Sequence, residues 1–127
     1  MMQAEDGKPA VGASARHLGV RVPADISPDD DGFVVPGDGG MSVAPGSAWN
    51  LPNHRRPRRL GRGSTGPNAD GVYRIEELSL DGRSLALRPD PKCAAVHAFV
   101  EPARRAPLGI YIDNLAATRD DWSEWRP

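Results

Sequence analysis

Two short stretches of the chain combine residue types that could do chemistry, and the first surrounds Ser42. It reads Gly39-Gly40-Met41-Ser42-Val43. Paired glycines let a backbone turn sharply and let a ligand approach closely, because no side chain intervenes. The serine beyond them can present one donor and two lone pairs to a ribose or an amide. The same pattern also fits a plain turn that enters a strand, and it lacks the spacing of a dinucleotide-binding or phosphate-binding loop.

The second stretch, residues 96–101, alternates as a half-buried strand does. Successive side chains of a strand point to opposite faces, so His97, Phe99 and Glu101 share one face. The apolar residues between them would face the core. A histidine, an aromatic ring and a carboxylate in a row could hold a planar ring and stabilise a developing cation. A solvent-facing strand surface is the alternative interpretation.

A cluster of five arginines without any acidic residue lies between His54 and Arg62. Guanidinium groups pair well with phosphates, which makes a nucleic-acid-binding module run by Arg55 to Arg62 an alternative function. No aromatic residues are interleaved for base stacking, however, and the net charge of the chain is only −1. We therefore expect a solvated loop that at most contacts a phosphate.

The sequence predicts no metal site. A zinc site needs several ligands at defined spacing, whereas His17, His54 and His97 are far apart and Cys93 is the only cysteine. A single cysteine cannot form an intramolecular disulfide, which fits a reducing compartment. We expect Cys93 to be inert.

The elements that must position these residues are short. The chain of 127 residues fits one domain, and an apolar fraction of 39% predicts a modest core. Residues 1–14 hold little apolar mass and are predicted to be a disordered lead-in to a single domain at residues 15–127. Glycine (14) and proline (13) demand many turns, and residues 45–70 are predicted to form a long irregular loop.

Hydrophobic patterns place the strands and one helix. Asp81-Gly82 favours a hairpin turn within residues 80–87, and Pro107 suits the first position of a helix over residues 107–122. The other predicted strands are residues 18–22, 33–35, 41–44, 72–75 and 96–101. The predicted fold is α+β: a small, mostly antiparallel β core with long loops and a C-terminal helix.

Taken in order, the chemical stretches resemble small cytotoxic effectors of bacterial type VI secretion, whose fold is similar to mono-ADP-ribosyltransferase toxins. The residues that carry the resemblance are 31–36, 39–43 and 95–104. In that family a Gly-Gly-x-Ser turn and a late-strand histidine followed by a Pro-Ala pair occupy comparable positions, with a helix closing the chain. The resemblance extends over residues 16–122.

The resemblance implies an ADP-ribosyltransferase-like fold, NAD as cofactor, and either mono-ADP-ribosyl transfer or NAD hydrolysis as the activity. It implies as catalytic residues Ser42, His97 and Glu101. The cofactor-binding residues that it implies are Arg16, Gly39, Gly40, Met41, Ser42 and His97. A threonine would be more usual than Met41, and His17 or Arg21 could take the place of Arg16.

The resemblance also implies an immunity protein as partner and an unknown acceptor of ADP-ribose in the target cell. No apolar stretch approaches the ~18 residues of a membrane span, and the polar N-terminus lacks a secretory signal. We expect a cytoplasmic location in the producing cell and export without a cleaved signal peptide.

The main alternative function is that of a non-enzymatic protein-interaction domain, which would use the acidic segment 25–38 and the basic segment 54–62.

Overall fold

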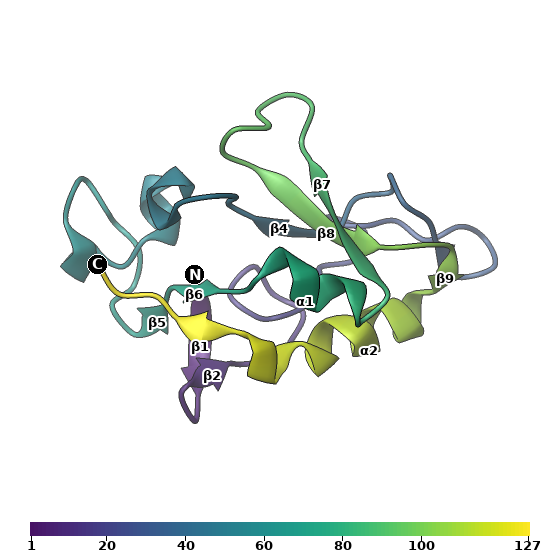
Figure 1. Ribbon diagram of the computed structural model, residues 1–127, viewed down its shortest axis with the longest axis horizontal. Coiled ribbons are helices and arrows are strands. Elements are labelled where there is room, and N and C mark those ends of the chain that lie inside the picture. Colours follow the sequence, from purple (N-terminus) through teal and green to yellow (C-terminus); the bar gives the residue numbers. More distant parts are fainter.

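The central sheet of the computed structural model, which describes residues 1–127, has three antiparallel strands. Its strand order is β4 (Met41–Val43), β8 (Ala98–Pro102) and β7 (Leu85–Pro89). The pairing places Ser42 opposite Phe99. In Figure 1 this sheet lies above the two α-helices. The predicted strands at residues 41–44 and 96–101 are thus confirmed, with ends shifted by one or two residues.

The N-terminal residues form a second sheet, so the expected disordered lead-in is wrong. β1 (Met2–Glu5) pairs with β2 (Lys8–Pro9) and with β5 (Asp70–Gly71). Asp6 and Gly7 join β1 to β2 with φ angles of 53° and 77°, the positive values of a two-residue hairpin turn. The pairing with β5 and the burial of Met2 hold this segment in place although it contains few apolar residues.

Two further strand pairs join the C-terminal third of the chain to earlier segments. β3 (Phe33–Val34) pairs with β9 (Ala106–Pro107), and β6 (Tyr73–Arg74) pairs with β10 (Ser123–Glu124). The strands predicted at residues 33–35 and 72–75 therefore exist in shortened form. The strand predicted at residues 18–22 does not, because Leu18 makes one isolated bridge and no further pairing follows.

The predicted hairpin around Asp81-Gly82 is wrong. These residues end the short helix α1 (Glu77–Asp81), and Gly82 has a φ of −71° rather than the positive value of a tight hairpin turn. Burial of Leu80 favours the helix, since its side chain packs into the core. The reversal before β8 occurs instead in residues 90–97, between β7 and β8.

The C-terminal helix is confirmed, although it ends before the predicted boundary. α2 spans Leu108–Ala117, with Pro107 at its N-cap, and a 3-10 turn follows at Arg119–Asp121. Tyr111 of α2 is fully buried, and its hydroxyl donates to the Val100 carbonyl and accepts from the Met41 amide. This one phenol joins the helix to two strands of the central sheet.

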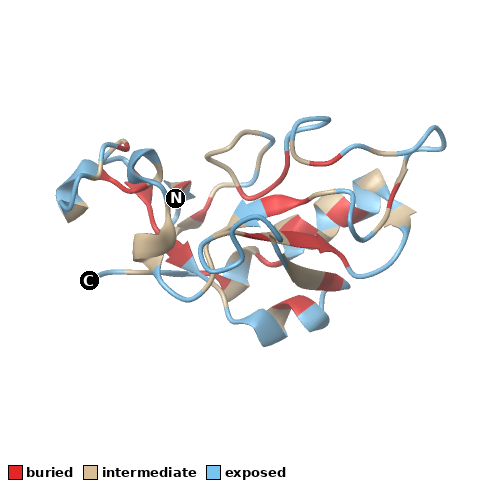
Figure 2. Cartoon of the chain, turned by 90° about the horizontal axis from the view of Figure 1, so that it is seen from above, coloured by how far each residue is buried: buried red, intermediate tan, exposed pale blue.

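The buried residues gather where the central sheet meets the helices, whereas many loop tips are exposed (Figure 2). Residues 45–70 are less irregular than predicted, since they contain 3-10 turns at Ala48–Asn50, Asn53–Arg55 and Arg58–Leu60. No helix has the length and apolar content needed to cross a membrane. The observed fold is α+β with antiparallel sheets.

Candidate functional site

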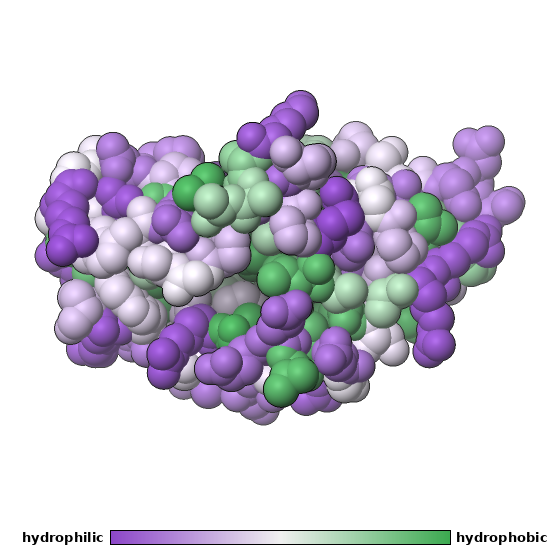
Figure 3. Space-filling view, turned by 45° about the horizontal axis from the view of Figure 1, so that its top comes forward, coloured by the Kyte–Doolittle hydropathy of each residue, from purple (hydrophilic) through white to green (hydrophobic).

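A cavity of about 770 Å³ lies against the central sheet. Its walls come from the N-terminal segment, from β4 and the residues after it, from β6 and the start of α1, and from the end of the chain. Figure 3 shows, on one face of the molecule, a hollow in which apolar surface is bordered by hydrophilic side chains. A concave surface of this size and mixed polarity is typical of a small-molecule site.

Ser42 and His97 both border this cavity, although they are far apart in the sequence. Ser42 is exposed in the edge strand β4, and His97 immediately precedes β8. The Phe99 ring lies opposite Ser42 in the sheet and contacts the His97 ring edge-to-face, with centroids 4.7 Å apart. The structure therefore brings the two stretches singled out by sequence to one place.

Strand alternation defines how Ser42 meets the cavity. Its neighbours Met41 and Val43 project to the opposite face of the sheet, and both line the cavity together with Leu87 and Val100. The apolar wall of the cavity is therefore that face. Ser42 itself points to the other face of the sheet. It borders the cavity because β4 is the edge strand, with no further strand beside it.

His97 is held by Asp90 at the start of the loop between β7 and β8. Its Nδ1 lies 2.8 Å from Asp90 Oδ2. The hydrogen bond from His97 and a second one from the Lys92 amide hold the pKa of the Asp90 carboxyl below its usual value. Because an ionised carboxylate can only accept, Nδ1 must carry the proton of this bond. The Nε2 of a neutral His97 then presents a lone pair that can act as acceptor or base.

Glu101, expected to be catalytic, does not line the cavity. Its side chain is only 8% exposed, and Oε2 accepts from Arg88 Nε at 2.9 Å and from the Gly37 amide at 2.8 Å. The Arg88 guanidinium also lies over the Phe99 ring. The predicted catalytic role is therefore corrected: Glu101 joins two strands to the turn before β4.

Three other carboxylates do line the cavity: Asp25, Glu76 and Glu77. Glu76 and Glu77 are exposed at the start of α1, where Glu76 is the N-cap residue and its side chain makes no capping hydrogen bond. Sequence reasoning missed them because it placed this segment next to a hairpin, with no reason to face the Ser42 stretch.

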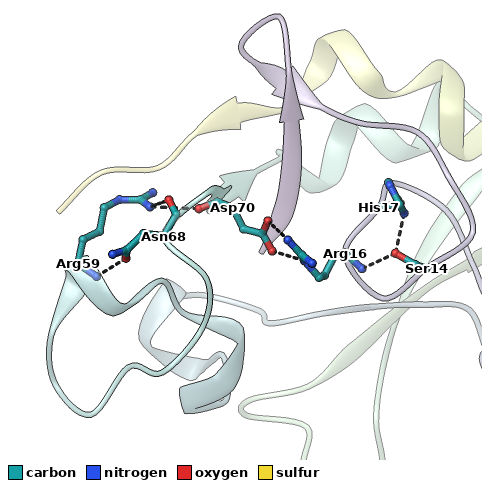
Figure 4. Close-up of polar contacts among 6 residues, drawn as sticks. All are labelled: Ser14, Arg16, His17, Arg59, Asn68 and Asp70. Atoms are coloured by element: carbon teal, nitrogen blue, oxygen red, sulfur yellow. Dashed lines mark hydrogen bonds and ion pairs between the residues drawn. The ribbon is translucent and has the colours of Figure 1, made fainter.

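Arg16 does not reach the cavity of Ser42 and His97, so its expected role is also corrected. Its guanidinium makes two 2.7 Å bonds to the buried Asp70 carboxylate (Figure 4), beside a separate cavity of about 380 Å³. The alternatives His17 and Arg21 do line the larger cavity. His17 Nδ1 shares a hydrogen bond with the Ser14 hydroxyl, and Arg21 pairs with Asp25.

Gly39 and Gly40 serve the packing of the chain itself. A Cβ on Gly39 would lie 2.2 Å from the Asp25 carbonyl oxygen, and one on Gly40 would lie 2.4 Å from that of Val100. Neither glycine lines the cavity, whereas Met41 is buried and does. The two glycines therefore make room for the backbone of Asp25 and Val100, rather than for a cofactor as expected.

The arginine cluster divides into structural and exposed members. Arg56 is buried, and its guanidinium donates to Ser64 and Asn53 and to the carbonyls of nearby turns. Arg59 donates to the Asn68 and Asp70 carbonyls (Figure 4). Arg55 lines the cavity. The expectation of a solvated loop is wrong for Arg56, whose side chain organises the 3-10 turns.

The structure brings together one set of possible metal ligands that was not predicted from the sequence, because histidines and cysteines were considered there but no carboxylates. The ligand atoms of Asp90, Cys93 and His97 lie within 4.8 Å of one another.

Comparisons with family models, with curated proteins and with solved structures gave no match to this chain. The functional interpretation therefore depends on the site.

Proposed function

We propose that this chain is an NAD-dependent cytotoxic effector that transfers ADP-ribose to an acceptor in target cells or hydrolyses NAD. The observation that carries the proposal is that Ser42 and His97 border one cavity of about 770 Å³. Ligand sites commonly have volumes of roughly 300 to 1,000 Å³, so the cavity has room for a nucleotide ligand.

The side chains around the cavity suit the parts of such a ligand. Arg21, His54 and Arg55 offer donors for a pyrophosphate, and the Ser42 hydroxyl can bond a ribose or a carboxamide. The Nε2 of His97 offers a lone pair on the same border. The apolar wall formed by β4 and β8 suits a planar base.

NAD, when bound, supplies a leaving nicotinamide and an ADP-ribose group whose sugar gains positive charge as that bond breaks. The chain contributes by holding the ribose and by placing lone pairs or negative charge beside it. Ser42 and His97 hold the sugar in this proposal. Glu76 or Glu77 supplies the carboxylate in place of Glu101, because both line the cavity and Glu101 does not.

The direct test is nicotinamide release by the purified full chain. We expect Ser42→Ala and His97→Ala each to lower the turnover by about a hundredfold or more, in the range typical of a lost positioning or proton-transfer group. Ser27→Ala is the matched control, since Ser27 is exposed and does not line the cavity. Undiminished turnover in both site variants would remove the proposed roles.

The proposal includes an immunity protein that occludes the cavity in the producing cell, and action in the target cytoplasm. Expression in a naive bacterial host separates it from the alternative of a non-enzymatic interaction domain. We expect growth arrest with the wild-type chain and relief of the arrest with His97→Ala. Normal growth with well-expressed wild-type protein would favour the interaction domain.

A further inference from the structure

The loop between β7 and β8 gathers three side chains that are good ligands for a transition-metal cation. They form the pattern Asp90-x-x-Cys93-x-x-x-His97. Backbone bonds close the loop around them, from the Asp90 amide to the His97 carbonyl and from the His97 amide to the Cys93 carbonyl, both at 3.0 Å. At its base Pro89 and Ala98 are paired in the sheet. The backbone thus holds the three side chains around a common centre.

The three donor atoms all lie within 4.8 Å of one another, near enough for one cation to contact them after adjustment. Asp90 Oδ2 lies 2.8 Å from His97 Nδ1 and 3.6 Å from Cys93 Sγ. Zinc binds oxygen, nitrogen and thiolate ligands at about 2.0 to 2.3 Å, which places tetrahedral neighbours about 3.3 to 3.8 Å apart. The Asp90–Cys93 separation falls in this range, whereas the hydrogen-bonded Asp90–His97 pair is shorter and must open for both atoms to bind one cation.

Cation binding changes the protons of two of the three ligands. The Cys93 thiol must lose its proton, because the thiolate is the form that binds a metal. The neutral His97 ring must move its proton from Nδ1 to Nε2, because Nδ1 is the atom that lies 2.8 Å from Asp90 Oδ2 in the cluster. The metal-bound ring then presents an Nε2–H donor in place of a lone pair.

We propose that Asp90, Cys93 and His97 form a three-ligand site for a divalent cation of the zinc class, at the border of the cavity. A thiolate beside an imidazole favours zinc over magnesium or calcium, which prefer all-oxygen sites. Three protein ligands leave a fourth position for water or another group. The cation fixes the loop and holds His97 where it borders the cavity.

Cobalt(II) is the probe for this site, because a thiolate bound to cobalt gives a charge-transfer absorption. Cys93 is the only cysteine, so such a band reports this residue alone. We expect the reduced, chelator-treated full chain to develop a saturable band at one cobalt per chain, and zinc to displace it. Cys93→Ser should abolish the band. Asp90→Asn should weaken binding by at least about tenfold, the smallest effect typical even of outer-shell partners.

His54→Ala is the matched control and should leave the cobalt affinity unchanged, because His54 lies outside the cluster. Circular dichroism of each variant verifies that the chain is folded. Two results would overturn the proposal: no thiolate absorption at any cobalt concentration, or a band at one cobalt per two chains that persists in Asp90→Asn. A failed titration with intact nicotinamide release removes the metal site alone, whereas bound cobalt without nicotinamide release removes only the proposed function.

Discussion

At the scale of single residues, His97 and Glu101 differ in whether a polar atom of the side chain remains available for a ligand. His97 uses Nδ1 for Asp90 and retains Nε2, beside the cavity. Glu101 is buried and uses Oε2 for Arg88 and for the Gly37 amide. Whether a side chain remains available for a ligand therefore depends on its contacts with neighbouring strands and loops. The residue pattern of a single strand does not contain these contacts.

Glu101→Gln should therefore lower stability without removing activity. A lost charge-assisted bond to Arg88 should reduce the free energy of unfolding by about 1.5 to 3 kcal/mol. Denaturant unfolding measures this loss, and nicotinamide release of the folded variant should stay within about threefold of wild type, since no transition-state contact is removed. A hundredfold drop in turnover with unchanged stability would restore Glu101 as the catalytic carboxylate.

Asp90 should contribute to the stability of the chain against acid. Its pKa is lower in the folded state, mainly through the His97 hydrogen bond, so the unfolded state binds more protons and stability rises with pH. The contribution is present above the unfolded pKa of about 3.9 and is lost as the pH falls through the folded value. Acid unfolding curves should be shallower for Asp90→Asn. Part of the loss of stability in acid should remain in this variant, because Asp29 also has a lowered pKa, mainly through a hydrogen bond from the Phe33 amide.

At the scale of elements, the turn before β4 is determined by packing of the backbone. Gly40→Ala should destabilise the fold by about 1 to 3 kcal/mol, because its Cβ would lie 2.4 Å from the Val100 carbonyl oxygen and 3.1 Å from the Tyr111 hydroxyl. Gly82→Ala is the control, since nothing lies within 4 Å of its Cβ and its φ is −71°. Thermal unfolding of both variants measures the difference, and equal midpoints would contradict the packing argument.

At the scale of the whole molecule, an ion pair joins the N-terminal segment to the middle of the chain. Arg16 makes two bonds to Asp70, which is 1% exposed and lies in the strand that pairs with β1. Arg16→Ala leaves a buried acceptor without its donors and should cost about 1 to 3 kcal/mol of unfolding free energy. NAD affinity should not change, and calorimetry checks this. A weaker NAD affinity in the folded variant would return Arg16 to the cofactor site.

Local patterns predicted the short strands near residues 33 and 41, the strand before Pro102 and the final helix, because apolar spacing and proline act within a few residues. They did not predict the N-terminal hairpin, whose strand β1 depends on pairing with residues 70–71. The resemblance implied a cofactor role for Arg16, and its bonds to Asp70 could not be predicted because the two residues are far apart in the sequence. Ser42 and His97 border one cavity, whereas the sequence offered no reason to place Glu76 and Glu77 beside it.

The central claim is that a nucleotide occupies the cavity bordered by Ser42 and His97, and amide chemical shifts in the presence of NAD test it most directly. We predict saturable shifts at residues 21, 42–48, 54–55, 72–77 and 96–97, all of which line or adjoin the cavity, with Arg16 and Asp70 unaffected. Shifts confined to the Arg16 side of the molecule, or none at millimolar NAD, would contradict the claim.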